Sequence, residues 1–157
     1  RAINSGDLLF VKRRGLVSIL IRVFTAESFN HVAMALRNPS GVFIVEMREG
    51  KGWQLMPMSQ WVATNKRSQI FWGKAPNGLR GSCCIERTAL KYRGTPYSYW
   101  SLLTVWWSQL WNRKTVANLV CSTFVQTVYE GCSYTKSDKT FDPSDLMGHV
   151  RDLNKIE

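Results

Sequence analysis

The segment HVAMALRNPSGVFIVEM, residues 31–47, constrains the fold more than any other part of this sequence. Two runs rich in apolar and β-branched residues flank the four residues NPSG at 38–41. Asn, Pro, Ser and Gly are the residues that tight turns favour. The pattern therefore predicts an antiparallel hairpin, in which residues 31–37 pair with residues 42–47.

The rest of the chain predicts a mixture of strands and helices. Strands are expected near residues 7–12 and 69–73, a loop around Gly50 and Gly52, and a turn followed by a terminal helix or strand in the tail. Apolar residues at helical spacing predict helices over 16–23, 58–64, 82–93 and 98–111, and a further helix that starts at Cys121. No repeat, linker or shift in composition marks a second domain, so we expect one α+β domain over residues 1–157.

The hairpin brings a histidine and a glutamate to the same face of the sheet. If the turn occupies residues 38–39, His31 lies directly opposite Glu46; if it occupies 38–41, Glu46 is the diagonal neighbour of His31. In both registers the Glu46 carboxylate, which is costly to bury alone, has an imidazole N–H as its partner. Such a carboxylate fixes the tautomer of the ring and leaves its second nitrogen free to exchange a proton with a thiol.

The segment NLVCSTFVQTVYEG, residues 118–131, places Cys121 where a helix is expected to begin. A cysteine at a helix N-terminus and next to an imidazolium is held as the reactive thiolate. The amide N–H groups of that helix start, including the one at Cys121, could also hold a developing oxyanion. Cys121, His31 and Glu46 then supply nucleophile, base and orienting acid. The alternative is that Cys121 fills the core, since free cysteine behaves as a small hydrophobe.

Six motifs occur in an order that resembles a known family: GDLLF at 6–10, NHVAMAL at 30–36, VFIVEM at 42–47, YRGTPYSY at 92–99, VCSTFV at 120–125 and DPSDL at 142–146. The order is similar to that of the circularly permuted branch of the NlpC/P60 superfamily, the papain-like group with the YiiX/YebB-like hydrolases and, more distantly, lecithin retinol acyltransferase relatives. The resemblance implies a papain-like α+β fold, in which an antiparallel sheet packs against helices and the nucleophile lies at a helix N-terminus.

The resemblance also implies a function and its residues. Cys121 would be the nucleophile, His31 the base and Glu46 the third residue, with no cofactor and no metal. Tyr97 resembles the aromatic residue that orients substrate near the site, although a packed core tyrosine is an equal alternative. The implied reaction is hydrolysis of an amide in a cell-wall peptide, or of an acyl ester bond, by a bacterial or bacteriophage enzyme. The basic stretch before His31 and the Trp-rich segment after Tyr97 depart from the family pattern.

The other cysteines do not form a recognisable disulfide or metal pattern. Cys83 and Cys84 are adjacent, Cys132 lies far downstream, and no Cys/His pair has metal-ligand spacing. We therefore expect all three to pack in the core as reduced thiols, which fits synthesis in the cytoplasm. No signal peptide opens the sequence, so action at the cell envelope or on a virion would follow release. His149, in the polar tail, is expected to be exposed and without a role.

The charge distribution supports a second hypothesis. The formal net charge is +10, and residues 51–129 hold ten Lys and Arg residues against one acidic residue, Glu86. Such a surface attracts polyanions. The alternative function is therefore a non-catalytic basic protein whose Trp-rich segment, residues 99–111, docks to a membrane or to a partner protein. No motif indicates specific nucleic-acid recognition, and the sequence leaves the oligomeric state open.

Overall fold

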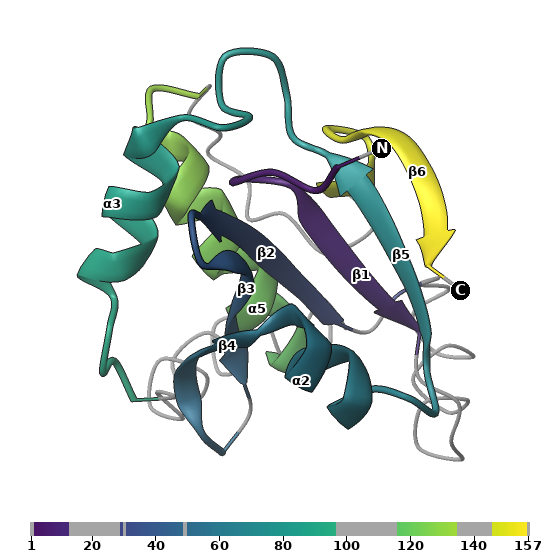
Figure 1. Ribbon diagram of the computed structural model, residues 1–157. Coiled ribbons are helices and arrows are strands. Elements are labelled where there is room, and N and C mark those ends of the chain that lie inside the picture. The colour runs from purple at the N-terminus through teal and green to yellow at the C-terminus, as the bar shows by residue number, and fades with distance from the viewer. Residues whose placement is uncertain are drawn as a thin grey trace, which may run out of the picture.

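The protein contains an antiparallel sheet of six strands with helices on both faces (Figure 1). The computed structural model describes residues 2–12, 29, 31–48, 50–96, 116–134 and 146–156, with the backbone alone for 116–120. The strands lie in the order β4-β3-β2-β1-β5-β6. Their bounds are β1 Leu8–Lys12, β2 His31–Asn38, β3 Gly41–Arg48, β4 Gly52–Pro57, β5 Gln69–Lys74 and β6 Arg151–Ile156. The described helices are α2 Met58–Thr64, α3 Cys83–Lys91 and α5 Val116–Glu130.

Most of the expected elements are present, with one strand missed. The hairpin, the strands near 7–12 and 69–73, and the helices over 58–64 and 82–93 are confirmed as β2–β3, β1, β5, α2 and α3. The tail ends in a strand, β6. The loop expected around Gly50 and Gly52 is wrong in part: both glycines have φ of +73° in a tight turn, and β4 begins at Gly52. The helices expected over 16–23 and 98–111 lie outside the described residues.

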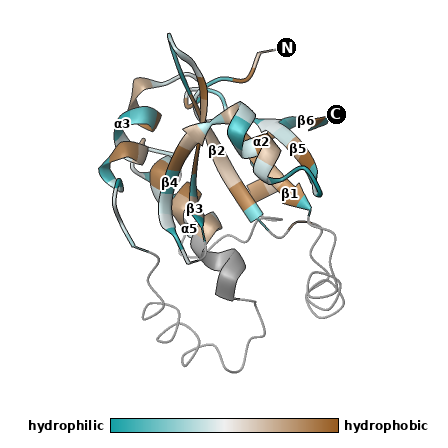
Figure 2. Ribbon diagram, turned by 60° about the horizontal axis from the view of Figure 1, so that its bottom comes forward, coloured by the Kyte–Doolittle hydropathy of each residue, from teal (hydrophilic) through white to brown (hydrophobic). Residues whose placement is uncertain are grey.

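Each face of the sheet buries its own apolar cluster, because successive side chains of a strand alternate between faces. On one face, Val32 and Met34 of β2 pack with Phe124 and Val125 of α5. On the other face, Ala33 and Ala35 of β2 pack with Trp61 of α2. Figure 1 shows α2 and α5 on opposite sides of the strands, and Figure 2 shows both apolar and polar segments along α3. Among the described residues, no helix has the length and hydropathy needed to cross a membrane.

A buried aspartate fixes the start of the sheet. Asp7 is fully buried, directly before β1, and its carboxylate accepts hydrogen bonds from Trp72 Nε1 at 3.0 Å and from the Ala75 amide at 3.0 Å. Arg80 Nε donates to the same carboxylate at 2.9 Å. A buried carboxylate is tolerated only with such partners. The Asp of the GDLLF motif thus ties β1 to the loop that follows β5.

A disulfide bond joins α3 to the end of α5, which corrects the sequence interpretation of the cysteines. Cys84 and Cys132 are bonded, with their Cα atoms 5.7 Å apart, whereas Cys83 is an exposed free thiol. Gly131 permits this approach, because a Cβ atom there would lie 2.9 Å from Thr88 Cγ2 of α3. Disulfides are typical of proteins that mature in oxidising compartments.

The second histidine is also placed differently from the expectation. His149 is half-buried, and its Nδ1 lies 3.0 Å from the Tyr134 hydroxyl. The two rings make an edge contact with centroids 5.9 Å apart. His149 therefore has a packing role at the end of α5 and is not a solvent-exposed tail residue.

Candidate active site

The register of the β2–β3 hairpin places His31 against Glu46. Asn38 pairs with Gly41 and Met34 with Val45, which is the register of a turn that occupies residues 38–41. Glu46 is therefore the diagonal neighbour of His31. His31 Nε2 lies 2.6 Å from Glu46 Oε2 in a buried hydrogen bond. The expected contact between the two side chains is confirmed.

Two further donors hold the Glu46 carboxylate, which is 1% exposed. Trp61 Nε1 of α2 donates to Oε2 at 2.9 Å, and Arg48 Nη1 donates to Oε1 at 3.4 Å. Burial alone would raise the pKa of Glu46, but the hydrogen bond and charge of His31, with Trp61 and Arg48, hold it below its usual value of 4.5. Glu46 is therefore ionised at neutral pH.

Sequence reasoning missed Trp61 and Arg48. One indication was present: a lone carboxylate in the apolar run VFIVEM needs several donors, and an imidazole supplies only one. Nothing in the sequence showed that α2 would place an indole N–H over β3. Trp61 is fully buried, so its N–H must have an acceptor, and Glu46 provides it.

Replacement of Trp61 by Phe is expected to destabilise the protein in a pH-dependent way. The variant loses a hydrogen bond to a charged group, worth about 1.5–3 kcal/mol, and the pKa of Glu46 rises toward 4.5. A lowered carboxyl pKa stabilises the fold above pH 4.5, and this contribution is lost as pH falls through the folded pKa. The difference in the free energy of unfolding between wild type and variant is therefore largest above pH 4.5 and decreases below it. Urea unfolding at several pH values measures this difference.

Trp53→Phe is the matched control for that experiment. Trp53 Nε1 donates to the neutral Ala89 carbonyl at 3.1 Å, so its loss removes an N–H without touching a carboxylate. Trp53→Phe should lower the free energy of unfolding by about 1 kcal/mol, and this loss should not depend on pH across the acid range. A Trp61→Phe effect with the same flat profile would show that Trp61 acts through packing alone.

Cys121 reaches the same histidine from the other side. Burial alone would lower the pKa of His31, but hydrogen bonds to the side chains of Cys121 and Glu46 raise it from 6.5 to about 9. His31 is therefore an imidazolium at neutral pH. Because Nε2 binds Glu46, Nδ1 is the ring nitrogen that remains for the sulfur of Cys121. His31 is the first residue of β2, and this position at the strand end lets the ring contact both groups.

The start of the helix that carries Cys121 differs from the expectation. The helix α5 begins at Val116, five residues earlier, so Cys121 lies in its second turn. Ser122 and Thr123 are residue types that often cap a helix, but Val116, Leu119 and Val120 continue the helical apolar spacing without a glycine or proline. The Cys121 amide is beyond the four N–H groups that a helix start leaves unpaired. It is therefore not the oxyanion donor that the sequence predicted.

The site is closed in this structure. Cys121 is 1% exposed and His31 is 9% exposed. A carbonyl carbon can reach the sulfur only if covering side chains move. Tyr97, expected to bind substrate, lies outside the described residues, as does the Trp-rich segment. In the described parts of the chain, no three His, Cys, Asp or Glu side chains gather in a way that could hold a metal ion.

Comparisons with known proteins find similarities to a family model and to solved structures. A family model described as permuted papain-like amidase enzyme, YaeF/YiiX, C92 family, matches residues 2–147. A solved structure, that of the metalloprotein yiiX from Escherichia coli O157:H7, is 16% identical, with a TM-score of 0.68, covering 99% of this chain and 97% of that chain. At this identity the structural match shows the fold alone. No match was found among curated protein sequences.

Proposed function

This chain belongs to the permuted papain-like amidase family, and from that premise we propose that Cys121, His31 and Glu46 are the catalytic residues of a cysteine hydrolase. The observation that carries the proposal is the chain of contacts through one imidazole. His31 contacts the Cys121 side chain on one side and the buried Glu46 carboxylate on the other. These contacts place an imidazole next to a sulfur, the arrangement of base and nucleophile that a cysteine hydrolase needs.

The chemistry follows from these positions. The Cys121 thiolate attacks the carbonyl carbon of an amide, and a C–S bond forms. As the C–N bond breaks, the His31 imidazolium donates its Nδ1 proton to the leaving amine. The neutral ring then takes a proton from water, whose oxygen attacks the thioester carbon. The C–S bond breaks, the acid is released, and the Cys121 thiolate and the His31 imidazolium are restored. Throughout, Glu46 holds Nε2–H and stabilises the positive charge on the ring.

The family description supports a substrate with an amide bond. An amidase family favours an amide over an ester, so we take an amide of a cell-wall peptide as the first candidate and an acyl ester bond as the second. The basic half of the chain, residues 51–129, suits both an anionic wall polymer and an anionic lipid surface.

A metal has no place in this mechanism. The similar yiiX protein is described as a metalloprotein. In the described part of this chain, the site offers one sulfur, one imidazole and one carboxylate. The imidazole and the carboxylate are hydrogen-bonded to each other. A metal would have to displace the hydrogen bond that orients His31. The described residues of the site therefore do not fit a metal ion.

Alkylation by iodoacetamide tests the proposal without knowledge of the substrate. Cys121 is expected to react at pH 7 faster than Cys83, although Cys83 is exposed and Cys121 is buried, because the His31 ring contacts the sulfur of Cys121 and can act as its base. His31→Ala should slow the modification of Cys121 at least about tenfold, since the sulfur loses this base, and leave that of Cys83 unchanged. Mass spectrometry of the modified peptides against time measures both rates.

One observation favours the second candidate function, a non-catalytic basic binding protein on the same fold. The sulfur of Cys121 is almost fully buried, as a core cysteine would be. In that case Cys83 would react first, and Cys121 would react at the same slow rate with and without His31. This result would contradict the hydrolase proposal.

A further inference from the structure

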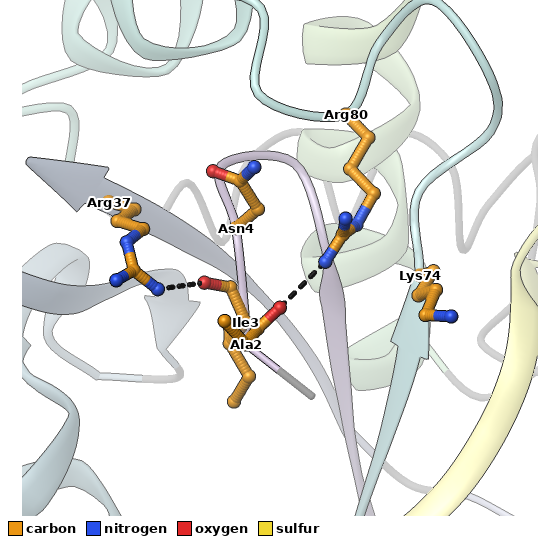
Figure 3. Close-up of a pocket in the computed structure, with 6 residues that line it drawn as sticks. All are labelled: Ala2, Ile3, Asn4, Arg37, Lys74 and Arg80. Atoms are coloured by element: carbon orange, nitrogen blue, oxygen red, sulfur yellow. Dashed lines mark hydrogen bonds between the residues drawn. The ribbon is translucent and has the colours of Figure 1, made fainter.

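A cationic pocket lies at the end of the sheet away from His31. It has a volume of about 390 Å³ and is lined by Ala2, Ile3, Asn4, Arg37, Lys74 and Arg80. Figure 3 shows Arg37 and Arg80 on either side of the Ala2–Ile3 segment, with Lys74 on the far side of Arg80 and its ammonium group directed away from that segment. Three of the six lining side chains are cationic and none is acidic. We propose that this pocket binds the phosphate group of an anionic ligand.

The two arginines are held in place before any ligand arrives. Arg37 Nη1 donates to the Ile3 carbonyl at 2.9 Å, and Arg80 Nη2 donates to the Ala2 carbonyl at 2.7 Å (Figure 3). Arg80 Nε is also fixed by Asp7 at 2.9 Å. A guanidinium carries five N–H donors, so both groups keep donors beyond those used here. Fixed side chains lose little conformational entropy when an anion binds.

The positive charge of the pocket is only partly compensated. Asp7 neutralises Arg80 but is fully buried, so it does not face a ligand. Lys74 pairs with Asp152, whose side chain is 55% exposed, so solvent screens this ion pair. Arg37 bonds a neutral carbonyl, and no ion pair of Arg37 occurs among the described residues. A guanidinium binds phosphate through two parallel hydrogen bonds, and the Lys74 ammonium adds to the positive charge that lines the pocket.

The pocket is independent of the catalytic site. Arg37 and His31 lie on the same strand, six residues apart, which corresponds to about 20 Å at the rise of a β-strand. A ligand there would not contact Cys121. The same phosphate chemistry could come from free phosphate or from the headgroup of an anionic lipid.

Titration with inorganic phosphate, at constant ionic strength, tests the pocket directly. Wild type is expected to bind, and Arg37→Gln or Lys74→Gln should each weaken binding at least about tenfold, the effect of losing one charge-assisted hydrogen bond. Arg67→Gln is the matched control, since Arg67 is exposed in a turn and its replacement removes the same charge. Because solvent and salt screen the charge of Arg67, Arg67→Gln should change the affinity for phosphate by less than about twofold. Isothermal titration calorimetry measures all four proteins.

A second arm uses vesicles of phosphatidylglycerol in phosphatidylcholine. Binding to vesicles that Arg37→Gln removes and Arg67→Gln keeps, without binding of free phosphate, assigns the pocket to a lipid headgroup. An absence of binding in both arms, or an equal loss in Arg67→Gln, overturns the proposal. Alkylation of Cys121 should be unchanged in the pocket variants, so failure here is separable from failure of the hydrolase proposal.

Discussion

Replacement of Cys121 by alanine is expected to abolish hydrolysis, with a fall in kcat/KM of at least about a thousandfold. The reason is that the variant has no atom able to form the covalent acyl-enzyme, and His31 and Glu46 alone offer only general base catalysis of water attack. The measurement compares wild type and Cys121→Ala on purified peptidoglycan fragments and on phospholipids. Release of free amine or of fatty acid identifies which bond is cut.

Cys83→Ala is the control for this comparison. It removes a thiol that is exposed and on α3, away from His31, so its activity should equal that of wild type. Retention of activity by Cys121→Ala would contradict the assignment of the nucleophile. Circular dichroism of Cys121→Ala must match wild type, because Cys121 also packs in the core between α5 and the sheet.

Reduction of the Cys84–Cys132 disulfide is expected to lower the free energy of unfolding by about 4 kcal/mol. The bond closes a loop with a sequence separation of 48 residues, and the chain-entropy model gives this magnitude for such a loop. For a chain of this length the melting temperature should fall by about 10 °C. Differential scanning calorimetry with and without dithiothreitol, repeated on Cys84→Ser, measures the effect.

The same experiment has an internal check. Cys83→Ser, one residue away, should melt like wild type without reductant and show the same fall with it. Equal melting temperatures for oxidised and reduced wild type would mean that the bond does not contribute to stability.

The sheet was largely predictable because its signals are local. The turn NPSG, the alternation along β2 and β3, and the parity argument for His31 and Glu46 all act within about 15 residues. The strand β4 was missed because Gly50 and Gly52 indicate a turn, and its sequence WQLMP lacks a polar–apolar alternation. It is an edge strand, whose pairing with β3 rather than its own pattern decides its conformation.

The errors at the cysteines come from long-range packing. The pairing of Cys84 with Cys132 depends on how α3 meets the end of α5, which depends in turn on Gly131. The sequence indicates a start of α5 at Cys121 because Ser122 and Thr123 open the run at helical spacing. Ser and Thr also occur inside helices, however: Thr127 Oγ1 donates to the Thr123 carbonyl within the same helix. The hydrogen bond from Trp61 to Glu46 likewise depends on how α2 packs on the sheet.

The positions of the proposed catalytic residues and of Trp61 along the chain fix the order in which they leave the ribosome. His31, Glu46 and Trp61 are spaced 15 residues apart and are made early, whereas Cys121 follows Glu46 by about 75 residues. At a synthesis rate of about 5–20 residues per second, Cys121 is added to the chain several seconds after the hairpin is complete. If cleavage requires Cys121, as we propose, a chain still under translation is inactive until α5 has emerged.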